Sequence, residues 1–92
     1  MNTNSKELSY NDLLQDRKWQ NKRNEIIKRD DYKCLNCASS KDLQVHHRQY
    51  HIIKKTNEYK KPWDYTHRYL ITLCQICHLD GHNHFKIPIF II

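Results

Sequence analysis

Two cysteine pairs are the residues of this sequence whose spacing most clearly indicates chemistry. Cys34 and Cys37 form one CxxC pair, and Cys74 and Cys77 form a second pair after 36 intervening residues. A CxxC loop lets two thiolates reach one ion, and two such loops complete a closed tetrahedral shell around zinc. The pattern therefore predicts a structural zinc site with four sulfur ligands. Disulfides or unligated thiols are the alternative interpretations.

Histidines next to the second pair indicate a second ion. His78 and His82 lie one turn apart on a helix, so both imidazoles can bind one metal. The doublet His46-His47, at the end of a predicted strand, is the obvious source of a third ligand. Neighbouring strand residues point to opposite faces, so one of the two can bind metal while the other faces a substrate. Three histidine ligands leave open positions for water and phosphate, which is the catalytic pattern.

The segment before the first cysteine pair predicts a short capped turn followed by one helix. Ser9 is a candidate cap for a short turn, with Asp12 as the acidic partner of a capping box. Asp16 is a second candidate cap, and the apolar side chains after it recur at helical spacing and predict a helix over residues 17–29. The opposite face is either a solvated surface or a stripe facing DNA, and it carries Lys18, Lys22 and Lys28.

Short strands and one helix must position the cysteines and histidines. Alternation over residues 43–47 predicts a strand with Leu43, Val45 and His47 on one face. A second strand over residues 70–73 leads into the second cysteine pair. A helix over residues 75–84 then presents the two later histidines on one side. His84 turns away from that side and is a poorer ligand.

A basic connection and an apolar tail complete the chain. We expect residues 48–68 to form a long loop, in which basic side chains interleaved with aromatic ones suit a nucleic-acid backbone. Its candidate DNA contacts are Arg48, Lys54, Lys55, Lys60 and Lys61. In the tail, residues 85–92, Pro88 excludes a central strand or a regular helix. The tail must pack on the core or on a partner, because it would otherwise promote aggregation.

Length and charge limit the class of protein. A chain of 92 residues is one domain, which we expect over residues 16–92 after a flexible segment, residues 1–15. The net charge of +6 favours an anionic partner such as nucleic acid, although an inert basic surface has the same charge. Neither a signal peptide nor a membrane-spanning run is present, so we expect a reducing, cytoplasmic compartment in which cysteines are ligands.

The ordered set of motifs resembles one family. The run from Trp19 through Cys34-x2-Cys37, His46-His47-Arg48, Leu70-Ile-Thr-Leu-Cys74-x2-Cys77 and His78-x3-His82 is similar to the four-cysteine HNH endonucleases. These are small metal-dependent nucleases of phages and bacteria with the ββα-metal, or His-Me finger, architecture. The resemblance covers most of the chain and implies an α+β fold, a ββα-metal domain with an N-terminal helix and a four-cysteine zinc site.

The resemblance also implies a role for each site residue. His47 matches the general base, whereas His46, His78 and His82 match the ligands of the catalytic metal. The family's asparagine, which orients the base, usually precedes the second strand, and here that position is Tyr69. A tyrosine hydroxyl can form a hydrogen bond, but it does not copy the two-sided geometry of an amide.

The implied activity is metal-dependent hydrolysis of DNA phosphodiester bonds, and we expect the DNA to be double-stranded. The implied cofactors are one structural Zn²⁺ and one catalytic divalent ion, which is Mg²⁺, Mn²⁺, Ni²⁺ or Zn²⁺. The expected location is the cytoplasm of a bacterium or of a phage-infected host, with self-association through the apolar tail as a further expectation. Two alternatives are a catalytically inactive HNH-like domain that binds DNA, and a small zinc module that binds a protein partner.

Overall fold

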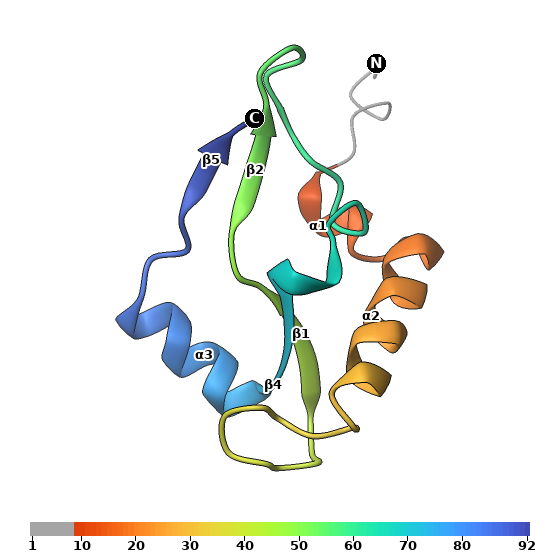
Figure 1. Ribbon diagram of the computed structural model, residues 1–92, viewed down its shortest axis with the longest axis vertical. Helices are drawn as coiled ribbons and strands as arrows, with labels where there is room; N and C mark the ends of the chain where they lie inside the picture. The colour runs from red at the N-terminus through yellow and green to blue at the C-terminus, as the bar shows by residue number, and fades with distance from the viewer. Residues whose placement is uncertain (1–8) are drawn as a thin grey trace, which may run out of the picture.

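An antiparallel pair of strands, β1 (Leu43–His47) and β4 (Leu70–Cys74), carries three of the predicted site residues, His46, His47 and Cys74. The computed structural model describes residues 9–92. The register pairs Leu43 with Cys74 and His47 with Leu70, so the histidine doublet lies opposite the start of β4. Helix α2 (Arg17–Arg29) and helix α3 (Gln75–His84) flank this pair on opposite sides (Figure 1).

The hydrophobic core lies between α2 and one face of the β1–β4 pair. Alternation along β1 directs Val45 and His47 toward the helix, and the corresponding residues of β4 are Leu70 and Thr72. The buried apolar cluster is small and consists of Trp19, Ile26, Ile27, Val45, Tyr65 and Leu70. A chain of this size buries little apolar surface, and a structural metal is a common source of additional stability.

The predicted helices and caps are confirmed. Helix α2 has the predicted bounds, and the Asp16 side chain accepts a hydrogen bond from the Lys18 N–H at 2.8 Å. Helix α1 (Tyr10–Leu13) begins at the predicted capping box, in which Ser9 and Asp12 each accept the other's backbone N–H. Of the expected flexible segment, residues 1–8 lie outside the described part of the chain.

The prediction of a long loop over residues 48–68 is wrong. Strand β2 (Tyr50–Ile53) pairs antiparallel with β3 (Glu58–Tyr59), and a short 3-10 helix, His67–Tyr69, precedes β4. Asn57 closes the turn between β2 and β3 with a φ of 59°, a conformation that asparagine tolerates better than most residues. Both strands are short and lysines flank them, so their alternation is weak in the sequence.

The tail forms an edge strand. Strand β5 (Ile89–Ile91) pairs in parallel with β2, which gives a three-stranded sheet of order β3–β2–β5. Pro88 lies just before β5, in agreement with the prediction that it excludes a central strand. The tail is expected to pack on the core or on a partner, but its backbone pairs with β2 and none of its side chains belongs to the core cluster of the described residues. Its side chains remain exposed, and Ile91 is 70% accessible.

These elements confirm the coarse fold class. The described residues form a small mixed α+β structure with three α-helices and two small sheets. Within residues 9–92, no helix has both the length and the apolar character needed to cross a membrane.

A buried carboxylate joins α2 to β4. The Asp30 carboxylate accepts hydrogen bonds from the Arg29 guanidinium at 2.8 and 2.9 Å and from the Thr72 N–H at 2.9 Å. Burial alone would raise the pKa of Asp30, but these hydrogen bonds lower it below its ordinary value. Arg29 also donates to the Leu70 carbonyl, so the end of the helix is fixed to the strand that carries the second cysteine pair.

We therefore expect Asp30→Asn to destabilise the fold by about 1.5–3 kcal/mol at pH 7, because an amide directs a donor at groups that need an acceptor. Asp31→Asn is the matched control, since the Asp31 side chain is 88% exposed and its nearest cation, on Lys33, is 4.0 Å away. Urea unfolding of the three proteins measures the difference. Equal losses in both variants would contradict the proposed role of Asp30.

Candidate active site

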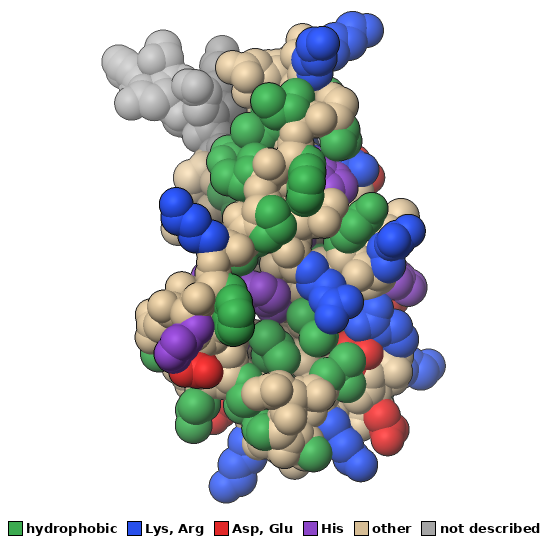
Figure 2. All heavy atoms as spheres, turned by 60° about the vertical axis from the view of Figure 1, so that its left-hand side comes forward, with side chains coloured by type: hydrophobic (Ala, Val, Ile, Leu, Met, Phe, Trp, Pro, Cys, Tyr) green, Lys and Arg blue, Asp and Glu red, His purple; other side chains and the backbone are tan. Residues whose placement is uncertain are grey.

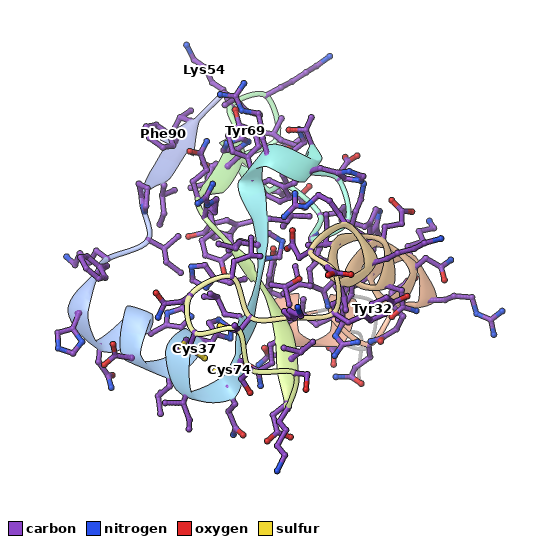
Figure 3. All side chains as sticks on the ribbon, turned by 60° about the horizontal axis from the view of Figure 1, so that its bottom comes forward. Tyr32, Cys37, Lys54, Tyr69, Cys74 and Phe90 are labelled. Carbon is purple, nitrogen blue, oxygen red and sulfur yellow. The ribbon has the colours of Figure 1, made fainter. Side chains whose placement is uncertain are left out.

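The four cysteines come together at the junction of β4 and α3. Their sulfur atoms all lie within 4.8 Å of one another, and the sulfurs of Cys37 and Cys74 are 3.6 Å apart. Figure 3 shows these two side chains meeting between the first CxxC loop and the start of α3. A tetrahedral ion with Zn–S bonds of about 2.3 Å separates its sulfurs by about 3.8 Å. All four residues are free thiols, so the cluster could bind a zinc ion.

Local structure aims each CxxC loop at this point. Ala38 adopts a φ of 67°, which turns the chain sharply after Cys37. Cys74 is both the last residue of β4 and the N-cap of α3, and its sulfur accepts from the Cys77 N–H at 3.5 Å. Backbone N–H groups directed at sulfur stabilise the thiolate form that binds a metal.

Four adjacent thiols cannot all ionise without a cation. Burial would raise the pKa of Cys34, but backbone N–H groups, including those of Cys37 and Asn36, lower it to about 6. At Cys77 the Asn36 amide lowers the pKa, yet the neighbouring cysteines outweigh it and raise the value to about 12. A divalent cation removes this conflict, because it stabilises all four thiolates together.

Three histidines form a second cluster on the α3 side of the strand pair. His46, His78 and His82 each offer a ring nitrogen within 4.8 Å of the other two. The Nε2 atoms of His78 and His82 are 3.0 Å apart, close to the spacing of about 3.3 Å expected for two ligands of a tetrahedral ion. His47 and His84 are not part of this cluster, and His84 instead contacts Asp80.

The surroundings of the histidine cluster favour the neutral form of the imidazole, which binds metals. Nδ1 of His78 lies 2.6 Å from Oε1 of Gln44, a contact that fixes the ring with Nε2 free for a ligand. Nδ1 of His46 is buried without a hydrogen-bond partner among the described residues. Burial, followed by the nearby His78 and His82, lowers the pKa of His46 to about 4. These three ring nitrogens fit a divalent ion, because the ion would bind nitrogen atoms that cannot all be protonated at the same time.

His47 occupies a different environment from its neighbour. Its ring stacks between Trp19 of α2, with centroids 5.0 Å apart, and Tyr50 of β2, at 5.3 Å. Nε2 donates to the Pro62 carbonyl at 3.0 Å, which leaves Nδ1 as the basic nitrogen. Burial lowers the pKa of His47, and the Pro62 carbonyl opposes that shift. The ring is therefore neutral near pH 7.

One cavity connects the two histidine environments. Its volume is about 220 Å³, and its walls include His47 and all three members of the histidine cluster. Tyr10 of α1 and Tyr50 of β2 complete the wall beside His47. A basic imidazole and a candidate metal site thus face the same space, which is the arrangement required to activate water next to a bound ester.

Tyr69 lies away from His47. Its ring contacts His51, with centroids 5.2 Å apart, and the Arg68 guanidinium at 5.3 Å. Figure 3 shows Tyr69 toward the end of the molecule that carries Phe90 and Lys54, far from the labelled cysteines. The Tyr69 carbonyl accepts from the Arg48 N–H at 2.7 Å, so its backbone holds the turn after the histidine doublet. The group that orients His47 is instead the carbonyl of Pro62.

The predicted cationic residues are spread over the surface. Arg48 is exposed and lines a groove of about 650 Å³ together with His46. Lys54 and Lys55 occupy the turn after β2, at the far end of the molecule from the cysteines (Figure 3). Lys60 lies 5.7 Å from the Tyr65 ring, and Lys61 is exposed. Only Arg48 thus adjoins the histidine cluster directly.

Sequence reasoning missed two residues that orient the histidines. Gln44 precedes His46 by two positions on β1, and the strand period alone places both side chains on one face. That spacing is a signal that could have identified Gln44. Pro62 acts through its backbone carbonyl, which carries no signal in the sequence.

The chain was also compared with known proteins. No family model, curated protein or solved structure matches it. The two clusters are therefore interpreted from their own donors, distances and surroundings.

We expect one tightly bound zinc per folded chain, and we expect Cys74→Ser to lose it and to lower the unfolding temperature, since metal binding and folding are coupled. His82→Ala is the control, because it removes a nitrogen of the other cluster and should retain this zinc. Elemental analysis and thermal unfolding measure both. Folded protein without zinc, or an unchanged transition in Cys74→Ser, would show that the cluster is not a structural metal site.

Proposed function

We propose that this chain is a metal-dependent endonuclease of the HNH class, with a ββα-metal active site that hydrolyses DNA phosphodiester bonds. The arrangement that supports the ββα-metal assignment is β1, β4 and α3 around the histidine cluster, with a four-cysteine cluster beside them.

The observation that carries the proposal is the shared cavity. A neutral imidazole, His47, and three candidate metal ligands line one space of about 220 Å³. Structural zinc sites have closed shells, whereas three histidine ligands leave a position open for a substrate oxygen. A structural role alone gives no reason for a basic group to face that opening.

His47 acts as the general base in this proposal. Its Nδ1 accepts a proton from a water molecule aligned with the scissile phosphorus, while Nε2–H remains bonded to the Pro62 carbonyl. That carbonyl keeps the ring in one tautomer and stabilises the imidazolium as it forms. Pro62 therefore performs the orienting role that the resemblance assigns to an asparagine at the position of Tyr69.

The histidine cluster holds the catalytic ion. When bound, a divalent ion stabilises the negative charge that develops on the phosphate oxygens during hydrolysis. Gln44 orients His78. Nδ1 of His46 is a buried nitrogen without a hydrogen-bond partner among the described residues, and it can serve as a metal ligand. Three imidazoles favour a borderline ion such as Zn²⁺, Ni²⁺ or Mn²⁺ over Mg²⁺, which prefers oxygen ligands.

Duplex DNA is the proposed substrate. The net charge of +6 favours a polyanion, and Arg48 lies beside the histidine cluster, where it can bind a phosphate next to the scissile bond. Lys54, Lys55, Lys60 and Lys61 extend along the β2–β3 hairpin and its exit, and we assign them to phosphates further from the cleavage site.

A second candidate function is a zinc module that binds protein. Strand β5 is an edge strand with exposed apolar side chains, and these are features of a surface that pairs with another chain, including a second copy. An HNH-like domain that binds DNA without cutting it is the remaining alternative, because Tyr69 stands where the resemblance expects an asparagine. Plasmid cleavage with added divalent metal distinguishes the nuclease from both.

We expect His47→Gln to reduce plasmid cleavage by about 10²–10⁴-fold, the usual contribution of a general base. Glutamine retains an N–H for the Pro62 carbonyl and fills much of the imidazole volume, so the fold is preserved. The second metal should still bind, because its three ligands are unchanged. A plasmid-nicking time course measures the rate, and calorimetric metal titration measures the site.

His46→Ala is the matched comparison within the doublet. It should weaken the second metal site, and excess metal should restore part of the activity. The opposite result, with His47→Gln losing the ion and His46→Ala keeping it, would reverse the two roles. Unchanged cleavage in both variants would contradict the nuclease proposal.

We also expect the joint replacement of Lys54, Lys55, Lys60 and Lys61 by alanine to weaken DNA binding and to flatten its dependence on salt, because fewer counterions are released. Joint replacement of Lys18, Lys22 and Lys28 on α2 is the control. Fluorescence anisotropy at several salt concentrations measures both. A loss of affinity in the α2 variant alone would show that the DNA-binding surface lies on that helix.

A further inference from the structure

A second pocket adjoins the proposed active site and has no part in the chemistry described above. Its volume is about 330 Å³, and its walls come from α1, β2, β3 and the tail. The residues that line it are Tyr10, Tyr50, Tyr59, Ile87 and Ile89. Small-ligand pockets begin at about 300 Å³. Figure 2 shows hydrophobic side chains gathered on the face that carries β5 and α3, with Lys and Arg side chains around them.

The three tyrosines form walls of aromatic rings. Tyr10 and Tyr50 meet edge to face with centroids 5.8 Å apart, and Tyr59 lies 6.3 Å from each of them. Edge-to-face contacts leave ring faces available to a third aromatic group. Tyr59 is 46% accessible, so its ring is open to a ligand. Flat aromatic groups stack on such rings with little dependence on their substituents.

This pocket lies beside the active-site cavity. Tyr10 and Tyr50 line both spaces, and Tyr50 also stacks on His47. A group bound between the tyrosine rings would therefore lie next to His47 and the histidine cluster.

We propose that the pocket binds one unpaired nucleobase of the nucleic acid, next to the scissile phosphate. This inference rests on the proposed nuclease function and specifies its substrate. A paired base is stacked on both faces and cannot enter a side pocket, so the nucleotide must be single-stranded, mismatched or rotated out of the duplex. The tyrosine rings supply the stacking surface.

An apolar segment of a protein partner is the competing occupant. The aromatic walls and the residues shared with the cavity of His47 favour a nucleobase over an aliphatic side chain. The protein-binding alternative predicts that changes in this pocket alter self-association rather than the choice of DNA.

The test compares three fluorescent DNA probes, which are a paired duplex, the same duplex with one mismatch, and the single strand. Affinities are measured in the His47→Gln background, so that the DNA remains intact. The mismatched duplex should bind at least about fivefold more tightly than the paired one, the lower end of what one stacked base contributes. Adding Tyr59→Ala should bring this ratio close to one, whereas Tyr59→Phe should keep it.

Tyr32→Ala is the matched control, because Tyr32 is also an exposed tyrosine but lies beside α2 (Figure 3). It should leave the ratio unchanged. Equal affinity for the paired and mismatched duplexes, or a preference that survives Tyr59→Ala, would overturn this inference while leaving the nuclease intact. A Tyr59→Ala effect on sedimentation alone would assign the pocket to protein binding. Absence of both DNA binding and cleavage in the wild type would overturn the inference together with the proposed function.

Discussion

The meeting of four cysteine side chains at one point is the constraint on which this structure depends. The first CxxC loop lies after α2, and the second lies where β4 becomes α3, so their meeting joins two distant parts of the chain. The hydrophobic cluster that would otherwise hold these parts together has six buried members among the described residues. A cation that binds all four sulfurs would turn the cysteine cluster into a cross-link.

The β1–β4 pair places the two histidines of the doublet in different environments. Because side chains alternate along β1, His46 turns toward α3 and a nitrogen-rich cluster, whereas His47 turns toward α2 and an aromatic stack. Gln44 contacts His78 in the cluster, whereas the Pro62 carbonyl accepts the hydrogen bond of His47. In the proposed enzyme, one short strand would thus supply a metal ligand and a base at adjacent positions.

The segment between the histidine doublet and β4 contains a β-hairpin that carries aromatic and cationic side chains. As a hairpin, it directs Tyr50 and Tyr59 against Tyr10 and supplies the partner for β5. Its lysines lie in the turn and at the exit of the hairpin, whereas Tyr50 and Tyr59 lie within its two strands. The proposed substrate contacts follow this division, with phosphates at the cations and a base at the rings.

The sequence by itself determined the elements with strong local patterns. Helical spacing and caps defined α2 and α1, alternation defined β1 and β4, and cysteine spacing identified the four-sulfur cluster, because each signal lies within a few residues. Tertiary structure decided the rest. The Pro62 carbonyl reaches His47 only through the path of the intervening hairpin, the tyrosine pocket draws on four separate segments, and β5 has a partner only once β2 exists. Such contacts depend on backbone groups and distant pairings, which residue types along the chain do not encode.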